Sequence, residues 1–408
     1  MDRKSVSRLR AQPGYSTFVG AATLSRISDE MFSVGVVLLV LDRTGSPELA
    51  GATVAAITLP SIVTAPLLGA WLDVSGRRRS LMLFDQVLIA AVVVALALMI
   101  GNTPDWTVPA VALLAGLTYP LSFGGFTSFI PALVPEDLLA PANALETTSF
   151  DLALVVGPAL AGTLSAVFGP AVPLLVEAAL AIAALLLIMR LRGLDRPGAG
   201  SGHPLASVVV DGLRQIVVVP ELRGVTVAGA IGLGGIGLWT VAFPLFAVEH
   251  LGAERSAAGY ILAAFAVGSS LGALAFVRFQ RRLRPASVVF GGLVVFGSLM
   301  LLWPLAGSLA VMLPLVALAA AADGPALAAT FAVRQQVVPP GLYGQVFTTA
   351  AGLKVGAFSV GSGLSGPVVS GLGSAETIVV AAGVQLVAAV TGFALMRLPL
   401  GRRAAAAR

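Results

Sequence analysis

Only a few residues of this chain have side chains that could do chemistry, and the most distinctive lie inside apolar segments. Arg26, Asp29 and Glu30 are spaced at i, i+3 and i+4 in one such segment. On a helix, this spacing places the guanidinium within reach of either carboxyl group. Charges are costly in apolar surroundings, so we expect the cluster to face other helices or water. Either an acid, with Asp29 favoured over Glu30, accepts a proton or contacts a cationic substrate, or the cluster neutralises itself and holds its helix against a neighbour.

Three further charged residues lie within apolar segments. Asp151 and Lys354 occupy similar depths in their segments, so they could form an ion pair, or each could meet water separately. Asp323 precedes Gly324-Pro325, where the proline should interrupt a helix and free a backbone carbonyl. Asp323 is therefore a candidate contact for a proton or a substrate.

Other polar residues are predicted to have structural roles. Glu146 follows Asn143 by three residues, which is the spacing of a capping box, although a role in proton coupling is the alternative. Asp85 and Glu177 lie nearer the ends of their segments, where snorkelling or local capping is expected. Five aromatic residues are candidates to line a cavity: Tyr119, Phe123, Phe126, Trp239 and Phe243.

The elements that must position these residues are membrane-spanning helices. The chain has 408 residues, of which 57% are hydrophobic and 11% charged, so lipid rather than water must be its main solvent. The first apolar segment is too long and too charged for a cleaved signal peptide. We therefore predict an all-α integral membrane protein with twelve transmembrane helices. They lie at about 17–41, 49–70, 81–101, 108–132, 145–168, 171–189, 223–248, 257–277, 286–306, 309–333, 346–370 and 377–396.

The composition also argues against several functional classes. The chain has no Cys and only two His, so a thiolate nucleophile is excluded and a His-ligated metal site is not expected. Its arginines are spread over short loops without interleaved aromatic residues, which argues against nucleic-acid binding. No nucleophile–base pair or phosphate-binding loop is present, so we expect neither an enzyme nor a bound cofactor.

The basic residues predict the orientation. With the N-terminus in the cytoplasm, every Lys and Arg faces the cytoplasm except Arg43, Arg255, Arg26 and Lys354. Positive residues concentrate on the cytoplasmic side of membrane proteins. Both termini are therefore predicted to be cytoplasmic.

The two halves of the sequence resemble each other. Val134-Pro135 and Val338-Pro339 lie about half of the 408-residue chain apart, as do Gly157-Pro158 and Gly366-Pro367. An even number of helices in each half gives both copies the same orientation, so their symmetry axis should run along the membrane normal. We predict two pseudo-symmetric six-helix bundles, at 1–190 and 223–408. The linker at 191–222 should carry an amphipathic helix on the membrane surface.

A basic turn between the second and third apolar segments also has features that suggest a specific contact. Gly69 lets its helix pack closely on a neighbour, and Gly76 permits a tight turn. Asp73 could accept hydrogen bonds from the N-terminus of another helix. The arginines that follow either take part in gating or only fix the topology; they are Arg77, Arg78 and Arg79.

This turn resembles the signature loop of the major facilitator superfamily, with the pattern Gly69-x-x-x-Asp73-x-x-Gly76-Arg77-Arg78-Arg79. The resemblance covers essentially the whole chain and implies that superfamily's transporter fold. It also implies that Asp73 contacts the start of helix 11 near Gly344 and Gln345. That contact would break and re-form as the transporter alternates between its two open states.

A second motif, in helix 5, points to export. Ala153-x-x-x-Gly157-Pro158-x-x-Ala161-Gly162 is similar to the glycine–proline motif of the superfamily's drug/proton antiporters. The motif either shapes gating or serves ordinary close packing. Two departures stand out: Val74 occupies a place where the family usually has Arg, and helix 4, at 108–132, has no Arg where many proton antiporters have one.

The expected function is export of small amphipathic molecules by alternating access, driven by proton antiport. The alternative is a symporter or uniporter that takes up a small nutrient or metabolite, because the fold does not fix the direction. The expected partners are a small-molecule substrate, protons and the lipid bilayer. We expect a monomer in a bacterial inner membrane.

Overall fold

The computed structural model describes residues 3–191, 204–253, 257–280 and 282–398. Within these ranges the chain forms helices and no strands, which confirms the all-α class. The elements of the first half are α1 (Arg3–Arg10), α2 (Tyr15–Thr44), α3 (Pro47–Thr58), α4 (Pro60–Ser75), α5 (Arg78–Met99), α6 (Thr107–Gly116), the π-helix η1 (Leu121–Gly125), α7 (Ile130–Leu133), the 3-10 helix η2 (Glu136–Leu138), α8 (Leu139–Phe168) and α9 (Val172–Arg190).

The second half begins with α10 (Leu205–Val218), and α11 (Pro220–Gly237) follows it at an angle of 88°. The remaining elements are α12 (Trp239–Glu249), α13 (Ala257–Gln280), α14 (Pro285–Met300), η3 (Trp303–Leu305), α15 (Leu309–Val337), η4 (Pro340–Leu342), α16 (Tyr343–Leu372) and α17 (Ser374–Arg397). The bend before α11 arises where extended Val219 precedes Pro220, because a proline disfavours helical backbone in the residue before it.

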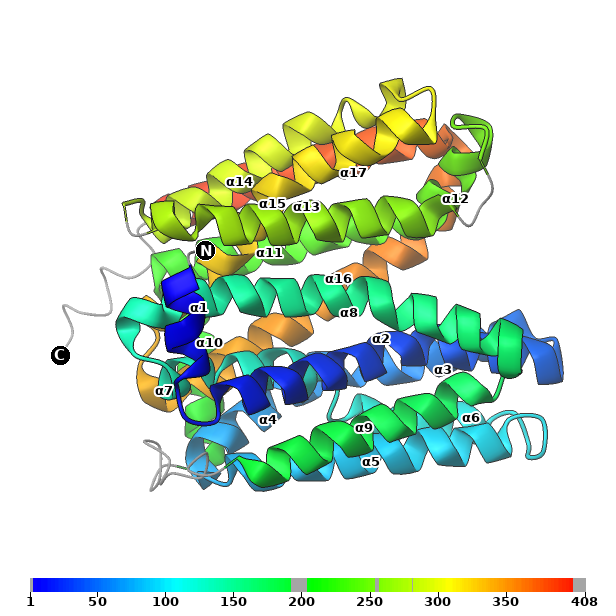
Figure 1. Cartoon of the computed structure of the whole chain (residues 1–408), viewed down its shortest axis with the longest axis horizontal. Helices are drawn as coiled ribbons and strands as arrows, with labels where there is room; N and C mark the ends of the chain where they lie inside the picture. Colours follow the sequence, from blue (N-terminus) through cyan, green and yellow to red (C-terminus); the bar gives the residue numbers. More distant parts are fainter. Residues whose placement is uncertain (1–2, 192–203, 254–256, 281, 399–408) are drawn as a thin grey trace.

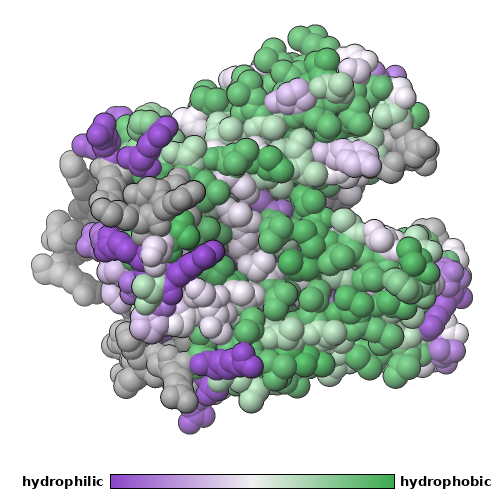
Figure 2. Space-filling model, viewed as in Figure 1, coloured by the Kyte–Doolittle hydropathy of each residue, from purple (hydrophilic) through white to green (hydrophobic). Residues whose placement is uncertain are grey.

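Within the described ranges, ten helical runs are long and apolar enough to cross a membrane, or up to eleven if the bent α10–α11 pair counts as one span. The two other predicted segments correspond to α2, which carries five charged residues, and to α11 followed by α12. Hydrophobic side chains cover the middle of the molecule, while the hydrophilic ones gather at its two ends (Figure 2). This distribution suits a protein embedded in a bilayer.

The helices lie in two groups, which we call the first group (α2–α9) and the second group (α11–α17) (Figure 1). Each group has apolar cores of its own; for example, Val36 and Leu96 are buried together in the first, and Phe243 and Trp303 in the second. The groups meet where α8 packs on α13 and α4 packs on α16.

Helix 4 of the sequence analysis departs most from its prediction. Instead of one helix over 108–132, the chain forms α6, the π-helix η1 and the short α7, with Pro120 immediately before η1. A proline cannot donate the hydrogen bond that a continuous α-helix requires at this position. Wider π turns are often found at functional sites.

Candidate functional site

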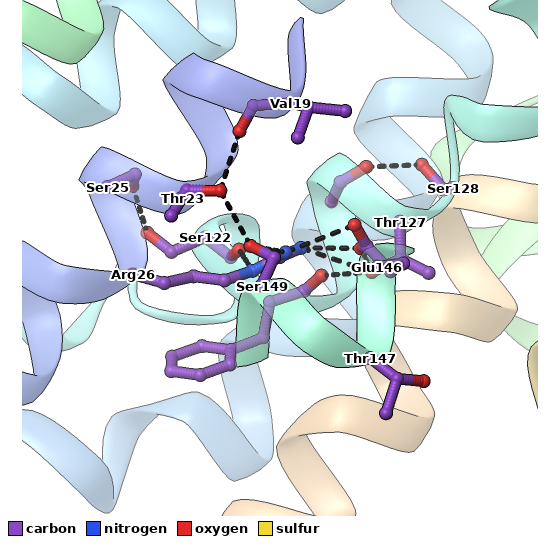
Figure 3. A network of polar contacts seen from close by, with 12 residues as sticks. Val19, Thr23, Ser25, Arg26, Ser122, Thr127, Ser128, Glu146, Thr147 and Ser149 are labelled. Carbon is purple, nitrogen blue, oxygen red and sulfur yellow. Dashed lines mark hydrogen bonds and ion pairs between the residues drawn. The ribbon is translucent and has the colours of Figure 1, made fainter. Parts of the chain in front are cut away.

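The central polar feature of the first group is an ion pair between Arg26 of α2 and Glu146 of α8 (Figure 3). The guanidinium donates to both carboxylate oxygens, at 2.6 and 3.1 Å, and to the Ser149 hydroxyl at 2.9 Å. It also donates to the Ser122 carbonyl of η1 at 3.2 Å. Arg26 is fully buried. The two hydrogen bonds to Glu146 compensate its positive charge, which would be costly in apolar surroundings without a partner.

This pairing corrects two sequence-based expectations. Arg26 does not pair with Asp29 or Glu30 within its own helix, because its side chain extends from α2 to α8. Glu146 does not complete a capping box, because α8 begins at Leu139 and Asn143 therefore lies inside the helix. An interior residue has no free N-terminal amide to cap.

Aromatic rings continue from this ion pair toward the second group. The Arg26 guanidinium lies 4.0 Å from the ring centroid of Phe150, at cation–π distance. Ring centroids are separated by 5.1 Å between Tyr119 and Phe123, by 5.7 Å between Phe123 and Phe150, and by 6.1 Å between Phe150 and Phe331 of α15. We call these four rings the aromatic ladder. It crosses from the first group to the second.

Three members of the ladder are half-buried, so part of each ring remains accessible: Tyr119, Phe123 and Phe150. Tyr119 and Phe123 were expected to line a cavity, whereas Phe150 and Phe331 were missed because nothing local marks them. The other three aromatic candidates are buried in the apolar cores: Phe126, Trp239 and Phe243.

A second polar cluster joins α8 to the second group. Asp151 of α8 accepts a hydrogen bond from the Ser270 hydroxyl of α13 at 2.8 Å. The ion pairs between described residues do not include Asp151 with Lys354, so the first of the two alternatives for these residues is not found in this conformation. Lys354 instead lies close enough to Asp323 for the two charges to interact.

Asp323 and Lys354 are both half-buried. The expected helix break at Asp323-Gly324-Pro325 is absent, since α15 continues from Leu309 to Val337 through this proline. At Gly324 the helix instead lies directly against the backbone of Ser269, which leaves no room for a side chain.

The basic turn places Asp73 against the second group. Asp73, fully buried at the end of α4, accepts hydrogen bonds from the backbone amides of Gly344 (2.9 Å) and Gln345 (2.8 Å). These amides begin α16, and a helix N-terminus attracts a negative group. The contact between Asp73 and the start of helix 11 that the resemblance implies is therefore present.

Close backbone packing supports this contact. A Cβ atom at Gly69 would lie 2.5 Å from the Gln345 Cα, so only glycine fits there. The Thr348 hydroxyl donates to the Ala65 carbonyl of α4 at 2.7 Å. Gly76 ends α4 with a φ of 64°, a left-handed conformation that glycine adopts at little cost. Gly69 therefore allows close helix packing and Gly76 permits the tight turn, as predicted from the sequence.

The three arginines of the turn differ in their surroundings. An Arg78 nitrogen lies 3.8 Å from a carboxylate oxygen of Asp73, and its guanidinium lies 5.4 Å from the ring centroid of Phe129. Arg79 donates to the Ile188 carbonyl at the end of α9 at 3.3 Å. Arg77 is exposed. Arg78 and Arg79 therefore have specific contacts beyond a general effect on topology.

The glycine–proline motif of helix 5 lies in the middle of α8. A Cβ at Gly157 would come 2.6 Å from the Glu30 Cβ, so this glycine brings α8 close to α2. Pro158 lies within α8, which continues to Phe168. Nothing lies within 4 Å of a Cβ placed at Gly162. Close packing therefore accounts for Gly157 and not for Gly162.

The two groups are joined tightly at one end of the molecule, the end where α1 and α10 lie (Figure 1). Besides the Asp73 contact, the side-chain amides of Asn143 and Gln335 exchange two hydrogen bonds of 2.9 Å each. We call this the closed end. At the opposite end, a wedge-shaped hollow separates the two groups (Figure 2).

Two buried acids were assigned the wrong surroundings from sequence. Asp85 and Glu177 are 0% and 1% exposed, so they neither snorkel nor cap a helix at the surface. Position along the apolar segment suggested otherwise, but burial depends on which face of each helix meets its neighbours. In the described part of the chain, no group of three or more His, Cys, Asp or Glu side chains could hold a metal ion.

Comparison with known proteins agrees with this architecture. The chain is 31% identical over 398 residues, covering 95% of both chains, to an uncharacterised MFS-type transporter, y4rN, of Sinorhizobium fredii. It is 29% identical to the multidrug efflux pump Tap of Mycolicibacterium fortuitum, over 88% of this chain and 90% of Tap. It also shares its fold with the human organic anion transporter MFSD10, with a TM-score of 0.72, 17% identity and coverage of 94% and 98% of the two chains.

The family model described as Major Facilitator Superfamily matches residues 18–348. That match, the relatives along almost the whole length of the chain and the two helix groups closed at one end lead to one conclusion: the chain belongs to the Major Facilitator Superfamily and is a transporter rather than an enzyme.

Proposed function

We propose that this transporter exports small amphipathic molecules by alternating access, with protons moving in the opposite direction. The observation that carries the proposal is the one-ended closure of the two helix groups. They are locked together by Asp73 and Asn143 at the closed end, and separated by a hollow at the other end. If the closed end opened and the hollow at the other end closed, a substrate bound between the two groups would be carried across the membrane.

The direction of opening follows from the proposed topology. With both termini in the cytoplasm, the closed end is cytoplasmic and the hollow faces outward, which is the state in which an exporter releases its substrate. The two halves at 1–190 and 223–408 would move against each other, with the linker at 191–222 spanning them. The inner membrane of a bacterium is the proposed location, and a monomer the proposed working unit.

The substrate class follows from the aromatic ladder. Half-buried rings of Tyr119, Phe123 and Phe150 offer flat apolar surfaces where the two groups meet. Glu30, Asp323 and Lys354, all half-buried, add charged groups of both signs. This combination suits molecules with an aromatic or apolar body and a polar end.

Export is favoured over uptake by two observations. The Gly157-Pro158 motif is similar to that of drug/proton antiporters, and the relative Tap is named a multidrug efflux pump. Uptake of a small nutrient by symport or uniport remains the second candidate function, since the same fold supports both directions.

The proposal is tested by transport assays in proteoliposomes. An imposed proton gradient should drive accumulation of a labelled aromatic cation or anion in the direction opposite to proton flow. Asp29→Asn, Asp151→Asn and Asp323→Asn should each be compared with the wild type to find the coupling acid. Substrate flux that does not depend on the proton gradient and is unchanged in all three variants would contradict proton coupling. Substrate movement in the same direction as protons would favour symport.

A further inference from the structure

Three arginines are buried among the described residues, and they differ in what surrounds their charge. Arg26, Arg223 and Arg334 are 0%, 5% and 4% exposed. Arg26 pairs with Glu146. Arg223 donates hydrogen bonds to backbone carbonyl oxygens in α10 and at the end of α17. These two arginines show how the protein satisfies a guanidinium that it buries.

Arg334 on α15 is the exception. The hydrogen bonds and ion pairs between described residues include none with its guanidinium, and its Nε is buried without a hydrogen-bond partner. The guanidinium lies 5.5 Å from the ring centroid of Phe347, but a ring face does not accept the N–H groups of an arginine as an oxyanion does. A buried charge without an opposite charge is costly. Arg334 therefore has the surroundings of a residue that receives its anionic partner from outside the chain.

The charged groups near Arg334 do not compensate it. The charge that interacts with Arg334 is that of Lys354 on α16, which has the same sign. Asp323 interacts with Lys354, and Asp151 interacts with Asp323, but neither acid does so with Arg334. Lys354 thus has an acid beside it, whereas Arg334 faces only a like charge.

Arg334 and Lys354 extend toward each other from helices that run in opposite directions. A helical side chain leans toward the N-terminus of its own helix. Arg334 is in the last turn of α15, so it leans back from the closed end, whereas Lys354 lies inside α16 and leans toward that end. Two cations that converge from neighbouring helices suit a single oxyanion.

The aromatic ladder ends beside these cations. Phe331 precedes Arg334 by about one helical turn, so the two side chains share a face of α15. Phe331 stacks on Phe150 of the first group, with ring centroids 6.1 Å apart. Gln335, the next residue after Arg334, bonds to Asn143 at the closed end. The guanidinium therefore lies between the ladder and the closed end, where it can meet the charged end of a molecule that stacks on the rings.

We propose that Arg334, assisted by Lys354, binds the carboxylate or sulfonate group of an aromatic organic anion whose ring system stacks on the aromatic ladder. The guanidinium donates two parallel hydrogen bonds to the oxyanion, and the Lys354 ammonium contacts it as a point charge. The assignment rests on the proposed export function and deepens it, because it gives the polar end of the exported molecule a negative charge.

The charge preference is measured by calorimetric titration of the purified full-length protein in detergent. Three naphthalene derivatives share one ring system and differ in charge: the carboxylate is an anion, the carboxamide is neutral, and the aminomethyl compound is a cation. The carboxylate should bind about 10-fold more tightly than the carboxamide, because a hydrogen bond to a charged group is the stronger one. Equal affinities for the three ligands, or tighter binding of the cation, would overturn the site.

Variants assign the preference to one residue. Arg334→Gln should bind the carboxylate and the carboxamide equally, with the affinity for the carboxamide unchanged. Arg334→Lys keeps the charge but loses the two-pronged geometry, so it should retain part of the preference. Arg278→Gln is the matched control, because Arg278 also lies near a ring, 4.9 Å from the centroid of Phe279, but is exposed. A preference in Arg334→Gln as large as that in Arg278→Gln would overturn the assignment.

Thermal unfolding separates a binding role of Arg334 from a structural one. Without ligand, Arg334→Met should unfold at the same temperature as the wild type or at a higher one, because it removes a buried charge that the chain does not neutralise. The naphthalene carboxylate should stabilise the wild type and Arg278→Gln but not Arg334→Met. A clear fall in the unfolding temperature of ligand-free Arg334→Met would show that this arginine already has a stabilising partner, and would overturn the site.

These measurements do not depend on transport. If the carboxylate binds as expected but its flux in proteoliposomes does not respond to a proton gradient, the proposed antiport fails and the anion site stands. If a proton gradient drives export of other aromatic molecules but the carboxylate does not bind, the proposed function stands and the anion site fails.

Discussion

Arg26 on α2 and Glu146 on α8 form a buried, two-pronged ion pair, with oxygen–nitrogen distances of 2.6 and 3.1 Å. It ties together two helices that are far apart in the sequence, and the guanidinium also contacts the π-helix η1 through the Ser122 carbonyl. The predicted helix 4, which forms α6, η1 and α7 and has no arginine, is therefore contacted by the guanidinium of Arg26 on α2.

We expect Glu146→Gln to destabilise the protein strongly, because it leaves Arg26 buried without a counter-charge. Removing one partner of a buried pair costs about 3–5 kcal/mol. The double variant Arg26→Met with Glu146→Leu should be less destabilised than either single change. Thermal unfolding in detergent measures these effects. The exposed Arg8–Asp137 pair provides the control, since Arg8→Gln should shift stability by about 1 kcal/mol at most. Equal losses at both pairs would contradict the assignment.

Gly69→Val should prevent full closure at the closed end, because a Cβ there would collide with α16. The chain lacks cysteine, so spin labels at Glu136→Cys and Gln336→Cys, one exposed residue from each group, report the separation without background. We expect the distance between the labels to increase in Gly69→Val. Gly51→Val, where the added Cβ meets nothing, should keep the wild-type distance. An unchanged distance in both variants would refute the closing role of Gly69.

The amide pair Asn143–Gln335 should act as a second lock on the same end. Asn143→Leu leaves the buried Gln335 amide unsatisfied, at a cost of about 1–3 kcal/mol. The double variant with Gln335→Leu should recover part of that stability, yet still populate the open form more than the wild type. The spin labels at positions 136 and 336 measure the population of the open form, and thermal unfolding measures the stability. Additive losses in the double variant would show that the two amides do not act together.

Phe150→Leu should weaken binding of aromatic substrates more than that of aliphatic ones, because Phe150 joins the ladder to Phe331. A stacked ring contributes about 0.5–1.5 kcal/mol, so the dissociation constant should rise about 2- to 10-fold. Phe168→Leu, at an exposed ring near the end of α8, is the matched control. Binding assays in detergent, with one aromatic and one aliphatic ligand, separate the effects. The same loss for both ligands would argue against stacking.

Gly157 and Gly162 offer a matched pair within one helix. Gly157→Ala should destabilise the protein, since its Cβ would come 2.6 Å from that of Glu30, while Gly162→Ala meets open space. Alanine favours helix over glycine, so Gly162→Ala should be neutral or stabilising by up to about 1 kcal/mol. Thermal unfolding compares the two. Similar effects at both positions would mean that close packing with α2 does not explain the motif.

The membrane class, the all-α fold, most helix positions and the family could be predicted from the amino-acid sequence alone. It also led to the contact of Asp73 with Gly344 and Gln345, through the resemblance of the basic turn. Most of these features could be predicted because hydropathy and helix length are local properties. The left-handed backbone at Gly76 is local as well, whereas Gly69 is required by the close approach of α16 and was predicted from the motif.

The partners of the charged groups, in contrast, became known from the packing of the helices. Arg26 pairs with Glu146 and not with the acids on its own helix. Asp151 accepts a hydrogen bond from Ser270 and does not pair with Lys354. Asp85 and Glu177 are buried between helices. Pairing and burial depend on how each helix is rotated about its axis and on which neighbour it faces. Those are properties of packing between distant segments, and an apolar segment, hydrophobic on nearly every face, carries little local signal for them.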